Sequence, residues 1–243
     1  MHIDLNADLG EGIGDDAAML AVVTSANVAC GGHAGDAESM RVVCRAAVAN
    51  DVRIGAHLSY PDRDRFGRTE MDIEPAALSA ALAVQLRELQ DAARVAGGVV
   101  SYIKPHGALY HRVSWDHGHA NAVVNLAAQY RLTVMGLPGS LVLELADAAG
   151  LPTLREAFAD RAYASDGSLV PRGEDGAVLH DCLAIADRMV SLVRSGTVRA
   201  IDGRNVSVSA DSICVHSDTP DAVTIARVLR AELTAAGVQI GAV

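Results

Sequence analysis

The sequence predicts an α/β protein that folds as a barrel of seven parallel strands. Three observations lead to this fold class. Short β-like runs alternate along the chain with stretches of helical periodicity, a pattern typical of parallel strands joined by crossover helices. Half of the 243 residues are hydrophobic, which is enough for a large buried core. Polar residues follow nearly every predicted strand.

Seven runs have the character of strands. The first is HIDLN near the amino terminus, and the last is ICVHSD. Each run is short, and each is followed by a stretch with helical periodicity. In chain order the strands are expected at residues 2–6, 27–31, 52–57, 99–106, 132–138, 154–160 and 213–218.

Six stretches between the strands carry apolar residues at intervals of three and four, the period of an amphipathic helix. Glycine lies near several of their ends, as is common where helices stop. Asp36 and Asp218 are candidate helix N-caps. No linker, composition shift or internal repeat divides the chain, so we expect one domain over residues 1–243. The helices are expected at residues 36–50, 75–97, 119–130, 139–150, 177–196 and 221–237.

The polar loops after the strands favour a closed barrel over an open, doubly wound sheet. In an open sheet, site residues gather at a switch point between two or three strands, whereas a barrel brings all strand ends around one mouth. The loops are DLNADLGEG, CGGHAGD, GAHLSYPD, KPHGALYH, FADRAYASDG and VHSDTPD. We therefore expect a polar site at the mouth of the barrel.

Four of the nine histidines lie in these loops or at these strand ends. A lone histidine there is more often structural than functional, but four on different strands indicate acid–base catalysis or metal binding. The four are His33, His57, His106 and His216. The others are expected at surface or helix positions: His2, His111, His117, His119 and His180.

Carboxylates accompany the histidines. By the two-residue period of a strand, Asp4, Asn6 and Asp8 share one face and can point inward, and Glu11 follows in the same loop. Imidazoles with a carboxylate are also ligands for zinc, manganese or iron(II). No HExxH motif is present, so such a site has to be assembled across strands. The candidate metal ligands are Asp8, His33, His57 and His106.

Lys104 is the only lysine, and the other 19 long cationic side chains are arginines. An ammonium group is more compact than a guanidinium. We therefore expect Lys104 to reach a substrate carboxylate or phosphate, and Lys104→Arg to keep the fold but lose most activity. In the loop PDRDRFGRTE, Arg63, Arg65 and Arg68 are either a solvated patch or lie beside the mouth, where at least one binds an anion.

Composition and motifs exclude several function classes. The net charge of −10 argues against nucleic acid and anionic membranes as partners. No signal-peptide pattern or membrane-length apolar run is apparent, so a cytoplasmic location is expected. The four widely spaced cysteines are interpreted as buried hydrophobic residues. The chain has neither a GxSxG motif nor a phosphate loop, so a nucleotide is held differently or its phosphate comes from another protein.

Six ordered blocks resemble the LamB/YcsF family over residues 3 to about 235. They are IDLNADLGEG, ANVACGGHAGD, IGAHLSYPDRDRFGR, YIKPHGALY, EAFADRAYASDGSLVPR and ICVHSDTPDA. The resemblance implies a seven-stranded, TIM-like β/α barrel related to glycoside hydrolase and sugar deacetylase barrels. It also implies a component of ATP-dependent 5-oxoprolinase, a hydrolase that acts with subunits B and C to open the lactam of 5-oxoproline to L-glutamate.

The site assignment combines the residue patterns with this resemblance. Phosphorylation of the lactam oxygen, by a partner that handles ATP, would prepare the ring carbon for attack by water. The expected catalytic residues are Asp8, His33, His57, Lys104 and His106, and the expected substrate-binding residues are Asn6, Glu11, Tyr60, Arg68, Arg172 and His216. Two alternatives remain: a metal-dependent deacetylase of an N-acetylated sugar, and a non-catalytic scaffold protein of the complex.

Overall fold

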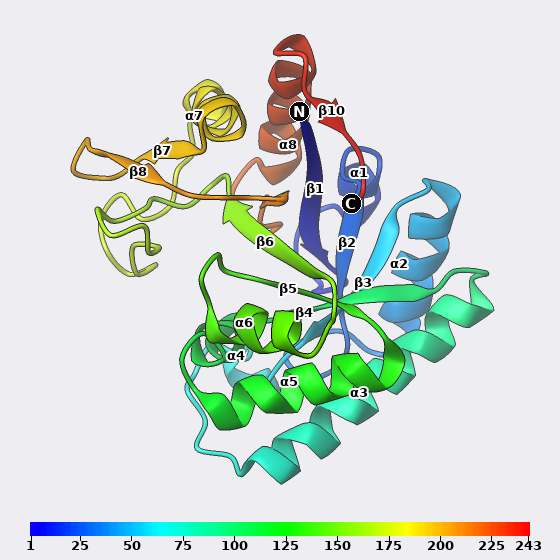
Figure 1. Cartoon of the computed structure of the whole chain (residues 1–243). Coiled ribbons are helices and arrows are strands. Elements are labelled where there is room, and N and C mark those ends of the chain that lie inside the picture. The colour runs from blue at the N-terminus through cyan, green and yellow to red at the C-terminus, as the bar shows by residue number, and fades with distance from the viewer.

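The computed structural model describes residues 1–243 and contains the expected closed barrel (Figure 1). Seven parallel strands follow one another in chain order, and the last pairs with the first. The strands are β1 (His2–Leu9), β2 (Ser25–Ala29), β3 (Arg53–Leu58), β4 (Val100–Pro105), β5 (Thr133–Gly136), β6 (Thr153–Phe158) and β9 (Ser212–Cys214). The predicted fold class is confirmed.

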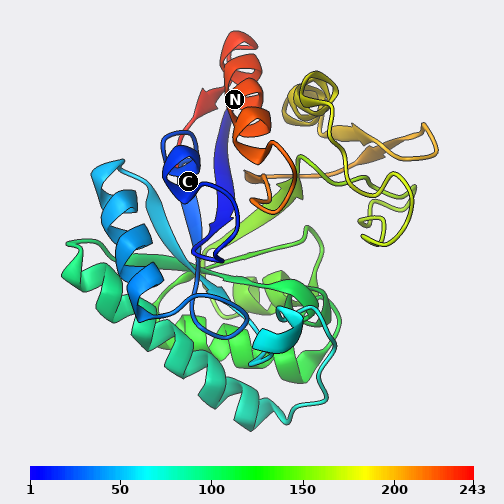
Figure 2. The ribbon, with the colours of Figure 1, turned by 180° about the vertical axis from the view of Figure 1, so that it is seen from behind.

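Helices cover the outside of the barrel, as the two opposite views show (Figure 1, Figure 2). They are α1 (Asp16–Leu20), α2 (Ala37–Ala49), α3 (Pro75–Val95), α4 (Gly107–Arg112), α5 (His117–Tyr130), α6 (Leu141–Ala148), α7 (Cys182–Ser195) and α8 (Ala222–Ala235). Asp36 caps α2, because its side chain accepts hydrogen bonds from the backbone of Glu38 and Ser39. None of the helices combines the length and apolar character that crossing a bilayer requires.

Two boundaries differ from the sequence prediction for identifiable reasons. β1 continues to Leu9 because it pairs with β2 as far as that residue. The helix expected from residue 177 begins only at Cys182, since the side chain of Asp181 caps it by accepting from the backbone of Leu183 and Ala184.

A long excursion, residues 159–181, separates β6 from α7. Its backbone folds back on itself through isolated bridges between Arg161 and Val178 and between Tyr163 and Leu169. A small antiparallel hairpin, β7 (Thr197–Arg199) and β8 (Asn205–Ser207), and the short β10 (Gln239–Ile240) complete the fold. The excursion and hairpin lie together beside α7 (Figure 1). Runs of two or three residues carry too little periodicity for these strands to be predicted.

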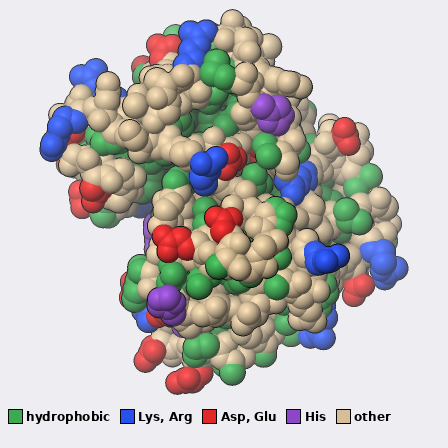
Figure 3. All heavy atoms as spheres, viewed as in Figure 1, with side chains coloured by type: hydrophobic (Ala, Val, Ile, Leu, Met, Phe, Trp, Pro, Cys, Tyr) green, Lys and Arg blue, Asp and Glu red, His purple; other side chains and the backbone are tan.

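Both faces of β1 are buried, but they differ in chemistry. Ile3, Leu5 and Leu9 belong to the main hydrophobic core. The alternate residues are buried polar groups whose partners come from other strands of the barrel. Asp4 accepts from Ser25 at 2.7 Å, and Asn6 donates to Ser212 at 2.7 Å. The barrel interior is therefore a polar column that leads to the mouth. On the outer face drawn in Figure 3, acidic, basic and hydrophobic side chains are interspersed.

Candidate active site at the barrel mouth

A polar cavity of about 70 Å³ lies at the carboxyl ends of the strands, and only three of its 17 lining residues are hydrophobic. Such a lining suits a small polar ligand better than an apolar one. Eight of the eleven residues expected at the site line this cavity: Asp8, Glu11, His57, Arg68, Lys104, His106, Arg172 and His216.

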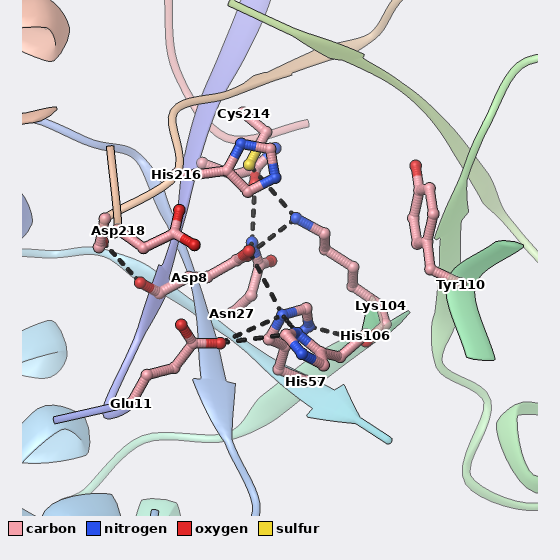
Figure 4. Close-up of polar contacts among 12 residues, drawn as sticks. Asp8, Glu11, Asn27, His57, Lys104, His106, Tyr110, Cys214, His216 and Asp218 are labelled. Carbon is pink, nitrogen blue, oxygen red and sulfur yellow. Dashed lines mark hydrogen bonds and ion pairs between the residues drawn. The ribbon is translucent and has the colours of Figure 1, made fainter. Parts of the chain in front are cut away.

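Three imidazoles and one carboxylate form a cluster beside this cavity, and all of them except His33 line it. His57 lies on β3, His106 follows β4, and His33 lies in the loop after β2, where its ring stacks on His106 at 3.6 Å. Glu11, from the loop after β1, places Oε1 2.9 Å from His33 Nε2 and 3.6 Å from His106 Nδ1. Figure 4 shows the carboxylate of Glu11 directed at His57 and His106.

Backbone carbonyls fix the tautomers of two of these rings. His57 Nδ1 lies 3.1 Å from the carbonyl oxygen of Lys104, and His106 Nε2 lies 2.9 Å from that of Phe66. Carbonyl oxygens only accept, so both nitrogens carry hydrogen. In the neutral rings, His57 Nε2 and His106 Nδ1 therefore bear lone pairs, yet they face each other at 2.9 Å. A shared proton or a metal cation would relieve this repulsion.

Burial favours a cation over extra protons in this cluster. Burial lowers the pKa of His33 to about 4, and burial, with the charges of His57 and His33, lowers the pKa of His106 well below its usual value. Burial and the nearby charge of Asp8 raise the pKa of Glu11 to about 7. Neutral imidazoles beside a carboxyl group are the donor type that Zn²⁺ and similar ions prefer.

The geometry of the cluster also fits a metal ion. One ligand atom each from Glu11, His33, His57 and His106 lies within 4.8 Å of the others. His33 Nδ1 is buried and has no partner. The carboxylate of this group is Glu11, which was expected among the substrate-binding residues, whereas Asp8, the expected ligand, lies 3.4 Å from His57 Nε2. Asp8 groups instead with Cys214 and His216.

Lys104 is held beneath the cavity between two carboxylates. Its Nζ lies 2.8 Å from Asp8 Oδ1 and 2.9 Å from Glu156 Oε1, and it is 3.3 Å from the sulfur of Cys214. Burial alone would lower the pKa of Lys104 and raise that of Asp8, because it disfavours both charges. The ion pairs outweigh burial: the pKa of Lys104 is raised well above its usual value. The charges of His57 and Lys104 likewise hold the pKa of Asp8 well below its usual value. Lys104 lines the cavity as expected, but in this structure its charge is paired with protein carboxylates.

His216 lies across the cavity from His57 and His106 (Figure 4), and Asp160 orients it. Its Nδ1 lies 2.9 Å and 3.1 Å from the two carboxylate oxygens of Asp160, and its ring stacks on Phe158 with centroids 5.1 Å apart. Asp160 is fully buried and also accepts from the hydroxyl of Thr219. Burial opposes ionisation of Asp160, but His216 outweighs it and lowers the pKa. Nδ1 is thus a donor, which leaves Nε2 for chemistry.

Asp218 joins two loops across the mouth. It accepts from Arg68, in the loop after β3, at 2.5 Å and from Arg172, in the excursion, at 2.9 Å. The residue at the start of α8 is Asp221, so the interpretation of Asp218 as a cap is wrong. Of the three arginines in the loop after β3, only Arg68 lines the cavity. Arg63 instead donates to the carbonyl of Gly31 at 3.0 Å.

Asn6 and Tyr60, which were expected to bind substrate, do not line the cavity. Asn6 is fully buried below Asp8, and both accept from the side-chain amide of Asn27. Tyr60 donates to His119 Nδ1 at 2.7 Å, because His119 Nε2 is committed as a donor to the carbonyl of Ile73. His119 therefore lies at a helix position, on α5, as one of its two expected placements, and is a buried partner of Tyr60.

Several site residues were not identified from the sequence. Glu156 and Asp160 both belong to the run LREAFAD, where a charged residue within a buried strand was the available signal. Tyr110 donates to Glu156 at 2.8 Å, and it lines the cavity together with His111 and Arg161. These three lie on α4 and the excursion, and only the folded chain brings them to the mouth.

Fold and site together define a β/α-barrel protein with a histidine-rich polar site at the carboxyl ends of its strands. The chain belongs to the LamB/YcsF family, whose model matches residues 3–243. It is 56% identical to the A subunit of 5-oxoprolinase from Streptomyces avermitilis, over 99% of each chain. It is 51% identical to an A subunit of 5-oxoprolinase from Pseudomonas syringae pv. tomato, over 98% of this chain and 96% of that protein.

Solved structures agree with this assignment. The lactam utilization protein from Thermus thermophilus superposes with a TM-score of 0.94 at 37% identity, over the whole of both chains. The family 4 carbohydrate esterase from Streptomyces lividans gives a TM-score of 0.52 at 15% identity, over 99% of this chain and 92% of that one. The second likeness reflects the shared barrel alone.

Proposed function

We propose that this chain opens the lactam ring of 5-oxoproline to give L-glutamate, as the A component of a multi-subunit 5-oxoprolinase. The names of its relatives supply the substrate and the complex. The observation that carries the chemistry is the pair of lone-pair nitrogens on His57 and His106, which lie on the same cavity as the oriented His216. Neither alternative from the sequence, deacetylase or scaffold, is favoured by the comparisons.

A lactam is a poor electrophile, so the ring carbon needs activation before water can attack it. We infer that partner subunits B and C use ATP to phosphorylate the lactam oxygen. This chain has no phosphate loop, and its cavity offers no glycine-rich cradle for a triphosphate. In this division of labour, the chain receives an O-phosphorylated lactam and catalyses the attack of water.

The attack requires a base and an acid at different places. The lone pair on His57 or His106 accepts a proton from water as its oxygen bonds to the ring carbon. The tetrahedral adduct can then expel phosphate, which restores the lactam, or expel the ring nitrogen, which opens the ring. His216 in its imidazolium form, with Nδ1–H held by Asp160, gives its Nε2 proton to that nitrogen, and the electron pair of the broken carbon–nitrogen bond stays on the nitrogen. The resulting γ-glutamyl phosphate is hydrolysed to glutamate and phosphate.

A divalent cation held by these lone pairs would take the place of the imidazole base in the first of these steps. Glu11, His33, His57 and His106 would hold it, and a cation bound there would lower the pKa of water and polarise the substrate as a Lewis acid. Asp8, kept ionised by Lys104 and His57, lies 3.4 Å from His57 Nε2 and can accept a hydrogen bond from it once that nitrogen has taken the proton of water.

Reconstitution tests the proposal. Glutamate formation from 5-oxoproline and ATP is measured with this chain alone, with subunits B and C alone, and with all three. We expect glutamate only from the complete mixture, and a loss of at least about 100-fold when His106 is replaced by Gln. Full activity of B and C without this chain would refute the proposed function. Full activity with the His106→Gln chain would refute the catalytic role of the mouth.

A further inference from the structure

The excursion between β6 and α7 buries an arginine that has no acidic partner. Arg161 lines the cavity and is only 5% exposed. Its Nη2 donates to the carbonyl of Val170 at 2.5 Å, its Nε donates to that of Ala177 at 3.4 Å, and no carboxylate forms an ion pair with it. A buried guanidinium without an anion is costly, so such groups are normally paired.

We propose that Arg161 and Arg172 form a subsite for an oxyanion, either a carboxylate or a phosphate, carried by the ligand of the cavity. Arg172 lies on the same excursion and lines the same cavity. Its one acidic partner, Asp218, is shared with Arg68. Three guanidinium groups on this side of the cavity therefore have a single paired carboxylate, which leaves an excess of two positive charges.

Neighbouring groups respond to this excess of charge. His111 lines the cavity, and burial together with the charges of Arg161 and Arg172 lowers its pKa. The charge of Arg172, after burial, also lowers the pKa of Arg161 itself. Mutual repulsion between buried cations is relieved when an anion binds between them.

Arg188 packs against the same excursion and provides a comparison for Arg161, because its charge is compensated within the protein. It also donates to two backbone carbonyls, those of Ala159 at 3.1 Å and Arg161 at 2.5 Å. However, it lies outside the cavity, is more exposed, and packs its guanidinium over the ring of Tyr163 at 5.3 Å. A cation–π contact compensates its charge, whereas Arg161 has no such contact.

The two walls of the cavity would orient a ligand. An anionic group at the arginines leaves the rest of a small ring facing His57, His106 and Glu11. Guanidinium groups bind carboxylate and phosphate oxygens through paired hydrogen bonds. The identity of the anion, as the carboxylate of 5-oxoproline or the phosphate of its activated form, rests on the proposed function. The existence of the subsite does not depend on that function.

Direct binding to the purified full chain tests the subsite. Calorimetric titrations use three probes: 5-oxoproline, 2-pyrrolidinone, which is the same lactam without the carboxylate, and inorganic phosphate. The variants are Arg161→Gln and Arg172→Gln. The matched control is Arg230→Gln, because Arg230 is also half-buried and donates to a backbone carbonyl, that of Val22, but does not line this cavity. Melting temperatures establish that each variant is folded. Arg172→Gln keeps the test open if Arg161→Gln does not fold, since Arg172 is half-buried.

We expect the cavity variants to weaken binding of an anionic probe at least about tenfold, with 2-pyrrolidinone and the control unchanged. Weaker 5-oxoproline binding assigns the subsite to the carboxylate, and weaker phosphate binding alone assigns it to the phosphoryl group. The subsite is disproved if the wild-type chain binds neither anion, or if both cavity variants bind them within twofold of wild type. If anion binding follows these expectations while the reconstituted mixture makes no glutamate, only the proposed function fails.

Discussion

Lys104 places one ammonium group between two buried carboxylates. Its Nζ contacts Asp8 and Glu156, and the side chain is only 3% exposed. Asn27 adds a neutral hydrogen bond to Asp8 at 2.8 Å. The ammonium therefore compensates the charges below the cavity and keeps the carboxylate of Asp8 beside His57. This is a positioning role, because the charge of Lys104 is already matched by protein groups.

Removing this ammonium should destabilise the fold. Lys104→Met keeps the length of the side chain but leaves two buried carboxylates without a cation, and we expect a loss of about 3–5 kcal/mol in the free energy of unfolding. Urea unfolding at pH 7 measures it, and Lys104→Met combined with Glu156→Gln should recover part of the loss. A loss below about 1 kcal/mol would contradict the role of the ion pairs. Lys104→Arg should also lower the melting temperature, because a larger group has to fit the same buried space.

The imidazole cluster should bind a metal ion. We expect the purified chain to take up about one Zn²⁺ or Mn²⁺ ion, and His57→Gln or His106→Gln to reduce this uptake strongly, since each removes one of four ligands. Metal content after dialysis is measured by mass spectrometry. His180→Gln, at an exposed position, is the control. Equal metal content in the control and the two cluster variants would contradict the assignment.

At the scale of elements, the loop after β3 holds the imidazole cluster in place. The carbonyl of Phe66 accepts from His106, and Gly67 packs directly behind the rings. Gly67 has a φ of 62°, and a Cβ there would lie 2.9 Å from Cβ of His33 and 3.1 Å from Cδ2 of His106. This position therefore needs glycine for two reasons, backbone conformation and space.

Gly67→Ala should lower both stability and activity. Strain at positive φ costs about 1 kcal/mol, and the clash should displace His33 or His106 from the cluster. Gly97→Ala is a matched control, because Gly97 has a φ of 82° and its Cβ would meet nothing within 4 Å. We expect similar losses in melting temperature from backbone strain, but a loss of glutamate formation only for Gly67→Ala in the reconstituted mixture. Equal activity of the two variants would show that the loop does not position the cluster.

Asp160 connects the end of β6 to the segment that follows β9. It holds His216 and Thr219, and His216 lowers its pKa in the folded state. A carboxyl group whose folded pKa is depressed contributes stability above its unfolded pKa, about 3.9. That contribution to stability is lost as the pH falls through the pKa of Asp160 in the folded state. The fold should therefore lose this contribution in acid.

The comparison of wild type with Asp160→Asn measures this contribution. At pH 7 we expect wild type to be more stable by about 1–3 kcal/mol, the range for a buried hydrogen bond to a charged group. The difference should shrink as the pH is lowered below about 4. Urea unfolding at several pH values gives the difference directly. A difference that stays constant down to about pH 2 would mean that ionisation of Asp160 does not stabilise the fold.

For the whole molecule, the sequence predicted the parts that depend on regular patterns. Alternating strands and helices predicted the barrel, and histidines at strand ends predicted the mouth where His57, His106 and His216 lie. It could not show that Lys104 is neutralised by Glu156, because that pairing joins β4 to β6 across the interior. Nor could it place Arg161, whose exposure to the cavity depends on the path of an excursion without periodic structure.

In the proposed mechanism, the barrel keeps the two proton transfers apart. The imidazole cluster comes from the loops and strands around β1 to β4, whereas His216 and Asp160 come from the ends of β9 and β6. The two sets belong to different parts of the barrel, and each has its own orienting partners. The cavity can thus offer, in the proposed mechanism, a base for water on one side and an acid for the ring nitrogen on the other.

The most direct test of ring opening at this site is the ratio of glutamate formed to phosphate released by the complete three-subunit mixture. The ratio is measured with the wild-type chain and with His216→Gln in its place. If His216 protonates the ring nitrogen, the adduct of the variant should expel phosphate and restore the lactam. Glutamate formation should then fall at least about 100-fold while ATP-dependent phosphate release continues. Glutamate formation at the wild-type level, or an equal fall in glutamate and phosphate, would contradict ring opening at this site.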